Sequence, residues 1–356
     1  MSYESYEIAP EQTRTHTGLR RLGKISLLCA AMLGASASQA ADYSLMMATT
    51  TPEGSPWGST LSTFEKLAEQ YTNNKVDIKI SFGGALGNDT QLLQKAQLGS
   101  TVQGAQSSGA QLGSVVPVIR SFDVPYIVDN VDDAMGIFYK EGHLQGKLVD
   151  DLQALMAKKN LRLLYATPFE FRGLLTSKPV VKPADMDGMK FRVTPSRVER
   201  GMISDLGAGA NTLGISEVYT ALQTGTVDGL AIPPITAVSF ALQEVGKNFN
   251  MLNFQPHPSF MLVNARTWNK LPKDVQEQVQ KAADDAVAQT RGNFDKALTD
   301  AIAKMKANGV TVHEPSAEEK AAFAAKITDS AVKTATDGFN DDETAFFEAL
   351  KASLKK

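Results

Sequence analysis

Hydrophobic and polar positions follow two different periods along the chain, and these predict strands interleaved with helices. Apolar side chains favour every second position over Asp42–Thr49 and Val76–Phe82, as they do in half-buried strands. Between these runs, Ser59–Asn73 places apolar residues three and four positions apart, which is the spacing of one helix face. A strand–helix–strand order of this kind predicts a parallel or mixed sheet with helices on its faces, and hence an α/β fold.

The same patterns continue to the end of the chain. Asn88 or Asp89 is placed to cap a helix that runs to Leu98, and we favour capping over ligand contact for Asp89. From Pro272 to Lys306 one apolar stripe is almost unbroken, with Gly292 as the expected point of bending. We expect further strands at Leu161–Tyr165, Lys190–Thr194, Val227–Leu230, Phe260–Asn264 and Val310–His313. Further helices are expected over Val131–Lys159, Leu213–Thr224 and Ala237–Lys247, and Ala317–Lys355 should be mainly helical with an interruption at Gly338.

The N-terminal region has the three parts of a secretory signal peptide. Arg20, Arg21 and Lys24 precede a short apolar run, which ends in small residues at Ser38 and Ala40. We expect residues 1–40 to be the signal peptide, with cleavage after Ala40 and secretion of the mature chain. A membrane anchor is the alternative, but the apolar run is too short to span a bilayer. The only cysteine, Cys29, lies inside this segment, so a cysteine nucleophile is not expected in the mature chain.

Composition narrows the class of function. The 356 residues suffice for two lobes of ordinary size, and 43% hydrophobic and 21% charged residues are usual for a globular protein. A net charge of −3 offers no basic surface for nucleic acid. The four histidines are scattered without metal-ligand spacing, so we expect no metal and no cofactor. The Gly207–Thr212 segment, GAGANT, lacks the third glycine and preceding strand of a dinucleotide site.

Arg192 is the leading candidate for ligand binding. It lies near the end of the expected strand Lys190–Thr194, and a helix should follow with Ser196 as its N-cap and Glu199 three positions later. Open α/β sheets place ligand-binding groups at such strand ends. A surface arginine in an ion pair is the alternative that position alone leaves open.

Several segments carry a family resemblance. Ala184–Val193 reads ADMDGMKFRV, and Ser216–Gly229 reads SEVYTALQTGTVDG about twenty residues later. Phe82–Ser100 and Ser121–Val128 add FGGALGNDTQLLQKAQLGS and SFDVPYIV. From about Ala41 to the mid-320s the chain resembles the solute-binding proteins of tripartite ATP-independent periplasmic (TRAP) transporters.

The resemblance implies a two-lobed periplasmic binding protein fold (type II-like), with mixed sheets flanked by helices and a long helix that spans both lobes. A coiled-coil dimer is the alternative reading of the long apolar stripe. With the family as a guide, we expect lobe I to comprise residues 41–166 and 258–295. Lobe II and the C-terminal helices would comprise residues 167–257 and 296–356.

The resemblance also implies the binding residues. Arg192 would hold a ligand carboxylate, and Arg172, in Ala166–Thr176, would add a second cationic contact; a solvent-facing loop arginine is the alternative for Arg172. Ser107 stands where sialic-acid-binding members carry an acidic residue, which argues against that ligand. Ile232 replaces a polar asparagine, so we expect a compact, partly apolar carboxylate. The other residues implied at the site are Trp57, Ser108, Thr194, Ile215, Pro233 and Phe260, although core packing is the commoner fate of a residue such as Phe260.

By this resemblance the chain is expected to bind a small organic carboxylate and deliver it to the small and large membrane subunits of a TRAP permease, as a monomer. It is not expected to be an enzyme, because no nucleophile elbow, phosphate loop or metal cluster is present in the sequence. A periplasmic enzyme acting on an organic acid and a sensory receptor that presents its ligand to another protein stay open as alternatives.

Overall fold

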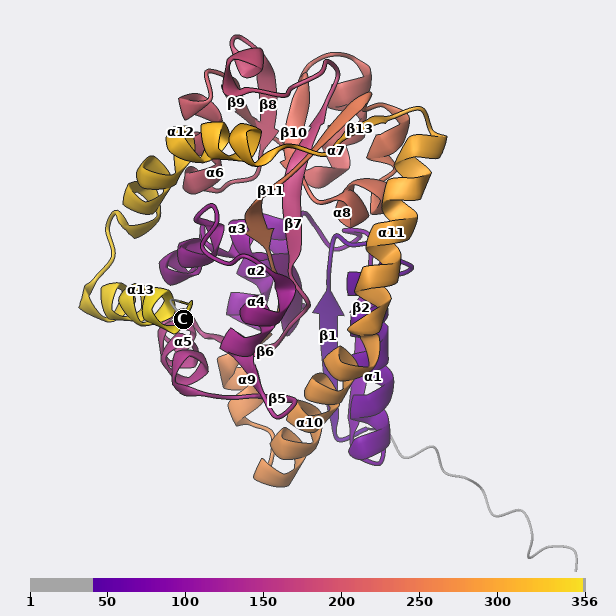
Figure 1. Cartoon of the computed structure of the whole chain (residues 1–356). Coiled ribbons are helices and arrows are strands. Elements are labelled where there is room, and N and C mark those ends of the chain that lie inside the picture. Colours follow the sequence, from indigo (N-terminus) through magenta and orange to yellow (C-terminus); the bar gives the residue numbers. More distant parts are fainter. Residues whose placement is uncertain (1–40, 355–356) are drawn as a thin grey trace, which may run out of the picture. The chain divides into compact units, whose positions relative to one another are not determined.

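Two β-sheets organise the part of the chain that the computed structural model describes, residues 41–354 (Figure 1). The chain from Ala41 onward forms one compact unit. The expected signal peptide, its cleavage site and Cys29 lie outside the described residues.

The first sheet combines strands from distant parts of the sequence. β1 pairs in parallel with β2 and β3, and β12 is inserted between β3 and β6, antiparallel to both. The strand expected at Phe260–Asn264 is therefore confirmed. Across the sheet the order is β2 (Val76–Ser81), β1 (Tyr43–Ala48), β3 (Gly104–Ser108), β12 (Ser259–Asn264) and β6 (Leu161–Ala166).

The second sheet is also mixed. Within this sheet, the adjacent strands β7 and β11 are antiparallel, which sets Glu170 opposite His257 and Arg172 opposite Gln255. β8 runs parallel to both β9 and β10. Across the sheet the order is β13 (Thr311–His313), β11 (Asn248–His257), β7 (Glu170–Thr176), β10 (Gly229–Ile232), β8 (Lys190–Val193) and β9 (Gly209–Thr212).

Helices cover the faces of the sheets (Figure 1). α1 packs along α10 and β2, whereas α6 and α12 pack on each other beside the second sheet. The helices are α1 (Pro56–Tyr71), α2 (Asp89–Leu98), α3 (Gly109–Leu112), α4 (Val131–Phe138), α5 (Lys147–Ala157), α6 (Arg197–Asp205), α7 (Ile215–Gln223), α8 (Pro234–Ser239), α9 (Ala265–Asn269), α10 (Lys273–Thr290), α11 (Gly292–Ala307), α12 (Ala317–Thr336) and α13 (Asp341–Leu354). Short 3-10 turns lie at η1 (Pro117–Asp123), η2 (Pro183–Met186) and η3 (Leu242–Glu244).

The chain links the two sheets at several points. It crosses from the first to the second between β6 and β7, and it returns between β11 and β12. α10 packs on β6 of the first sheet and α11 on β13 of the second, so the expected long helix spans both (Figure 1). Its break falls at Arg291, directly before Gly292. Gly338, at a φ of +74°, turns the chain from α12 back to α13, which packs on α5 beside the first sheet. The residue bounds of the two lobes stay a prediction.

Three expected elements differ in the structure. The helix expected over Val131–Lys159 is divided by the hairpin β4 (Tyr139–Lys140) and β5 (His143–Leu144), whose turn needs positive φ at Glu141 and Gly142. The helix expected over Ala237–Lys247 instead begins at Pro234 and ends at Ser239.

The third difference bears on the site. The first long helix begins at Pro56, not at Ser59, because the Ser55 hydroxyl accepts a hydrogen bond from the Gly58 amide at 3.1 Å and caps it there. Trp57 therefore sits on a helix rather than in a loop, and its position is fixed.

Candidate functional site

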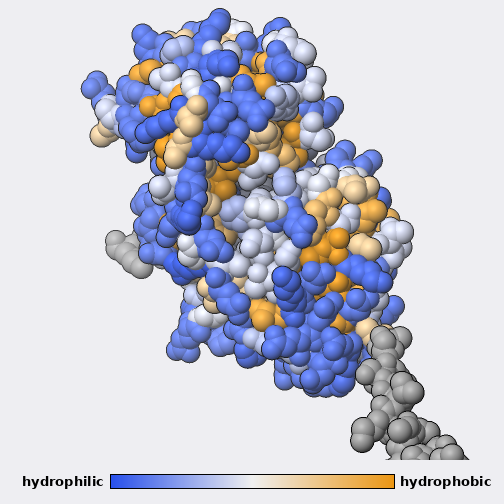
Figure 2. Space-filling view, turned by 90° about the vertical axis from the view of Figure 1, so that its right-hand side faces the viewer, coloured by the Kyte–Doolittle hydropathy of each residue, from blue (hydrophilic) through white to orange (hydrophobic). Residues whose placement is uncertain are grey.

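A cavity of about 50 Å³ lies where strands of both sheets end. β3, β8 and β10 all lead into it at their carboxyl ends, where α/β sheets commonly bind ligands. The expected residues that line it are Trp57, Ser107, Ser108, Arg172, Arg192, Thr194, Ile215, Ile232 and Pro233. In Figure 2 the face shown is mainly hydrophilic, with hydrophobic atoms visible in the hollow between its upper and lower parts.

Arg192 enters the cavity from the end of β8. The strand is held between β9 and β10, so the backbone of Arg192 is fixed on both sides. Its Nε donates a hydrogen bond to the carbonyl oxygen of Leu213 at 3.0 Å. No described residue contacts the two terminal nitrogens as a hydrogen-bond or ion-pair partner. Burial lowers the pKa of Arg192, but a guanidinium keeps its charge in proteins. The side chain is thus a nearly buried cation with its fork free.

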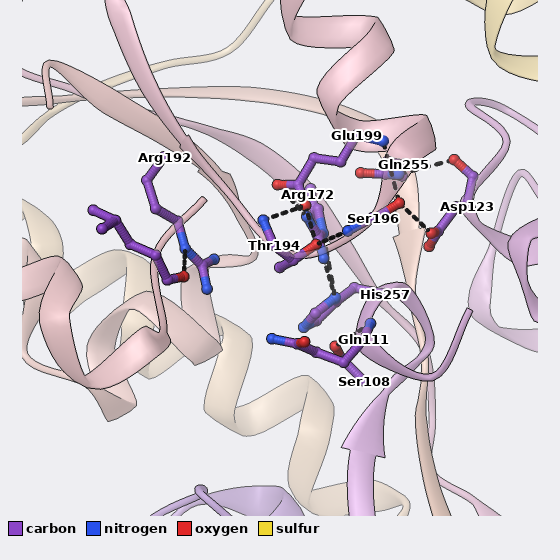
Figure 3. A network of polar contacts seen from close by, with 11 residues as sticks. Ser108, Gln111, Asp123, Arg172, Arg192, Thr194, Ser196, Glu199, Gln255 and His257 are labelled. Atoms are coloured by element: carbon purple, nitrogen blue, oxygen red, sulfur yellow. Dashed lines mark hydrogen bonds and ion pairs between the residues drawn. The ribbon is translucent and has the colours of Figure 1, made fainter. Parts of the chain in front are cut away.

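Arg172 is not in a solvent-facing loop. It lies on β7, between β10 and β11, and its side chain is only 2% exposed. Its Nη1 forms an ion pair with Oε1 of Glu199 at 2.8 Å. Its Nε and Nη2 face Nδ1 of His257 at 3.2 and 3.0 Å. In Figure 3 Arg172 lies within this set of contacts, whereas Arg192 stands apart from it.

Glu199 connects Arg172 to the start of α6. The Ser196 hydroxyl accepts from the Glu199 amide at 3.2 Å, so Ser196 is the N-cap, as expected. The second half of the expected capping box does not form. Oε2 of Glu199 instead accepts from the Thr194 amide at 2.9 Å and from the Thr194 hydroxyl, while Oε1 faces Arg172. Glu199 is fully buried, and no local pattern in the sequence predicts that its carboxylate turns toward the site.

Asp123 closes the far side of this polar network (Figure 3). Its Oδ2 accepts from the Ser196 hydroxyl at 2.9 Å, and its carbonyl oxygen accepts from Gln255 at 2.8 Å. Burial raises the pKa of Asp123 to about 7, against the opposing effect of Arg172.

His257 and Asp89 line the cavity but were not expected there. Burial, together with Arg172 and Arg192, lowers the pKa of His257 well below its usual value, so its imidazole is neutral. Since Nδ1 accepts from Arg172, Nε2 carries the proton and is a donor. Asn88, not Asp89, caps α2. Asp89 accepts from the Thr50 hydroxyl at 3.0 Å, and burial raises its pKa.

The described residues contain no group of three or more His, Cys, Asp or Glu side chains that could hold a metal ion. None of their helices is both long and apolar enough to cross a membrane.

Comparison with known proteins places this geometry in a family. The model of the bacterial extracellular solute-binding proteins, family 7 (DctP), matches residues 47–336. The chain belongs to this family. The C4-dicarboxylate-binding periplasmic protein DctP of Rhodobacter capsulatus is 32% identical over 275 residues, which is 77% of this chain and 80% of that protein. The sialic acid-binding periplasmic protein SiaP of Vibrio cholerae is 26% identical over 289 residues, 80% of this chain and 87% of that protein.

Solved structures of the family have the same fold. A TRAP periplasmic solute-binding protein from Desulfovibrio salexigens with bound orotic acid gives a TM-score of 0.82 at 24% identity, covering 88% of this chain and 98% of that one. One from Citrobacter koseri with bound D-glucuronate gives 0.77 at 29% identity, covering 86% and 98%. This family-7 protein therefore has the two-lobed fold of TRAP solute-binding receptors, and a periplasmic solute-binding family implies a periplasmic location.

One expected site residue of this solute-binding protein lies elsewhere. Phe260 does not line the cavity; it is fully buried on β12. Its ring packs 5.6 Å from Phe138 and 6.0 Å from Phe122, centroid to centroid. Side chains alternate between the two faces of a strand, and that of Phe260 belongs to the core.

Ser107 and Trp57 offer polar atoms to the cavity of the receptor. The Ser107 hydroxyl and the Trp57 Nε1 are buried, and neither has a hydrogen-bond partner among the described residues. Buried polar groups are normally hydrogen-bonded, so both suit contact with a polar ligand or ordered water. Ile215, Ile232 and Phe240 form an apolar wall beside them.

Proposed function

We propose that this chain is the periplasmic receptor of a TRAP transporter and that it binds a compact organic carboxylate in the cavity. The observation that carries the proposal is the free fork of Arg192 in a buried position. A planar guanidinium fork can donate two parallel hydrogen bonds to a carboxylate, and such charge-assisted bonds are strong where water is excluded. Arg172 is the second cation at the cavity wall.

The size and lining of the cavity favour a small ligand. A cavity of about 50 Å³ is far smaller than the roughly 300–1,000 Å³ of pockets that hold larger ligands, so it suits an acid of a few carbon atoms rather than a sugar acid. The apolar wall at Ile215 and Ile232 favours a remainder with few hydroxyl groups. Trp57, Ser107, Ser108, Thr194 and Pro233 complete the proposed binding surface.

Closure of two lobes on the ligand is part of the proposal. The cavity takes Ser107 from β3 of the first sheet and Trp57 from α1, which packs beside that sheet. It takes Arg192 and Ile232 from strands of the second sheet. A ligand that contacts both sets binds the closed form better than an open one and shifts the population toward it. A radius of gyration that is unchanged by saturating ligand in X-ray scattering would contradict closure.

A receptor also fits the chemistry of the cavity better than an enzyme. Nδ1 of His257 is occupied by Arg172, and none of the described hydrogen bonds joins His257 to a serine. Triad-type nucleophiles need such a base within hydrogen-bond reach.

We also propose that the chain has the role that its family implies. The signal peptide is cleaved after Ala40, and the mature chain acts in the periplasm as a monomer. It transfers the ligand to the two membrane subunits of a permease. No cofactor and no nucleic acid take part.

The test is a calorimetric titration after a thermal-shift screen of small organic acids. A ligand at about 100 times its dissociation constant adds roughly 2.7 kcal/mol of stability, which such a screen detects. Arg192→Ala should weaken binding of any hit well over tenfold, and Arg192→Lys should restore only part of it, because loss of one partner of a buried charge pair costs about 2–5 kcal/mol. Arg266→Ala, at an exposed arginine on α9, is the control. Unchanged affinity in Arg192→Ala would overturn the proposal.

A further inference from the structure

The two positive charges beside the cavity are not equally available to a ligand. Two guanidinium groups, Arg172 and Arg192, line it. Arg172 faces the carboxylate of Glu199 at 2.8 Å, and the two side chains are 2% and 0% exposed. At that distance and depth a carboxylate offsets most of the field of its partner, because little water is present to do so instead.

Two of the three guanidinium nitrogens of Arg172 also have a hydrogen-bond acceptor, whereas Nη1 has only its ion pair with Glu199. Beyond Glu199, its Nε and Nη2 point to the single acceptor Nδ1 of His257. The imidazole has to be neutral to accept, so His257 adds no positive charge to the cavity. Arg172 therefore holds Glu199 and His257 in place more than it attracts an anion.

Arg192 is different in both respects. Its hydrogen-bond partner among the described residues is a neutral carbonyl oxygen, that of Leu213, which occupies Nε and leaves the fork uncovered. Glu199 is the acid with the largest effect on Arg192, but its ion pair is with Arg172. Asp89, on the cavity wall, also acts on Arg192 and is hydrogen-bonded to Thr50. Asp89 can only reduce the positive charge offered to a ligand. Glu217, which also acts on Arg192, is exposed to solvent.

We infer that Glu199 cancels the charge of Arg172 and thereby restricts the cavity to ligands with one negative charge, held by Arg192. This inference rests on the proposed function and narrows its ligand class to compact monocarboxylates with an uncharged remainder. A second carboxylate would be buried without a free cation, close to Glu199 and Asp89, and burial of an unpaired charge is strongly unfavourable. The relative from Rhodobacter capsulatus is named for C4-dicarboxylates, so this chain would differ from it.

Matched ligands test the charge rule without any mutation. Malonate and succinate each have a monoamide, malonamate and succinamate, of nearly the same shape and with one charge fewer. Calorimetric titration of the wild-type protein at about pH 7.5 compares the two members of each pair. In any pair that binds, the monoamide should bind at least tenfold more tightly than its diacid. Tighter binding of the diacid would overturn the inference.

A variant then identifies the residue responsible. Glu199→Gln keeps an oxygen that can accept from the Thr194 amide but removes the charge. We expect the ratio of diacid to monoamide affinity to rise at least tenfold in this variant. The control is Glu217→Gln, which removes the same charge from an exposed position and should leave the ratio unchanged. An unchanged ratio in folded Glu199→Gln protein would also overturn the inference; if that variant fails to fold, the wild-type comparison still decides.

Failure of this inference is distinguishable from failure of the proposed function. If diacids bind better and Arg192→Ala abolishes their binding, the receptor function stands and only the charge rule is lost. If neither the four probes nor any acid of the initial screen binds, or if binding survives in Arg192→Ala, the proposed function fails and the inference fails with it.

Discussion

Trp57 and His257 stack on each other at the cavity wall, with ring centroids 5.1 Å apart and planes inclined by 26°. Trp57 comes from α1, which packs beside β2 of the first sheet, and His257 ends β11 of the second. The stack is thus a contact between the two halves of the fold. Its two rings also line the cavity, so a ligand and the stack are direct neighbours.

This position makes Trp57 a reporter of ligand binding. The chain has two tryptophans, and the other, Trp268, lies on α9 beneath Arg162, away from the cavity. We predict that ligand binding changes the intrinsic tryptophan fluorescence, because it alters the surroundings of Trp57. Trp57→Phe should remove the change, and Trp268→Phe should keep it. A signal that survives in Trp57→Phe but not in Trp268→Phe would place the ligand elsewhere.

Local signals were enough to predict the position of Arg192. A β-branched and aromatic run predicted β8, and Ser196 was correctly expected to cap α6, since both depend on residues within a few positions of each other. The β12 strand and the long helix α10–α11 were also predicted, because their patterns are long or strongly apolar. Together these elements position the backbone around the site.

Contacts between distant residues could not be predicted in this way. Glu199 and Arg172 are on different elements, and only the packing of α6 against the second sheet brings them to 2.8 Å. His257 gives no local signal that it meets Trp57, two hundred positions earlier in the sequence. Arg172, for which a solvent-facing loop was the alternative, lies on a central strand whose two neighbours, β10 and β11, come later in the chain. Such pairings are fixed by tertiary structure.

The Arg172–Glu199 pair should matter for folding as well as for binding. Removal of one partner of a buried ion pair leaves the other uncompensated, which typically costs about 3–5 kcal/mol. We predict that Arg172→Met lowers the free energy of unfolding by an amount in this range, measured by urea denaturation. The double variant Arg172→Met, Glu199→Gln should lose less than the sum of the two single variants. Additive losses would show that the two side chains are not coupled.

Asp123 should make stability depend on pH. Its pKa is about 7 in the folded protein, whereas an unperturbed aspartate titrates near 3.9. Between these values the folded chain holds a proton that the unfolded chain has released, so this group's contribution to stability falls as pH rises from about 4 to about 7. Asparagine cannot ionise. We predict that Asp123→Asn gains stability relative to wild type across this window and that the gain levels off above it.

Thermal unfolding at a series of pH values measures this effect. Asp300→Asn is the control, because Asp300 is exposed on α11 and pairs with Lys296 at the surface. The difference in melting temperature between Asp300→Asn and wild type should stay nearly constant with pH. A pH-independent difference for Asp123→Asn as well would mean that Asp123 is ionised in the folded protein throughout this range.

Phe260 belongs to the hydrophobic core, whereas Ile232 belongs to the cavity wall. Both are almost fully buried, but only Ile232 lines the cavity. Phe260→Ala should cost about 3–5 kcal/mol of stability and Ile232→Ala about 2–5 kcal/mol, because each leaves a void in a packed region. We predict that ligand affinity, measured by calorimetry at a temperature where both variants are folded, changes in Ile232→Ala and stays within about twofold of wild type in Phe260→Ala. A large loss of affinity in Phe260→Ala, with Ile232→Ala unaffected, would return Phe260 to the binding site and remove Ile232 from it.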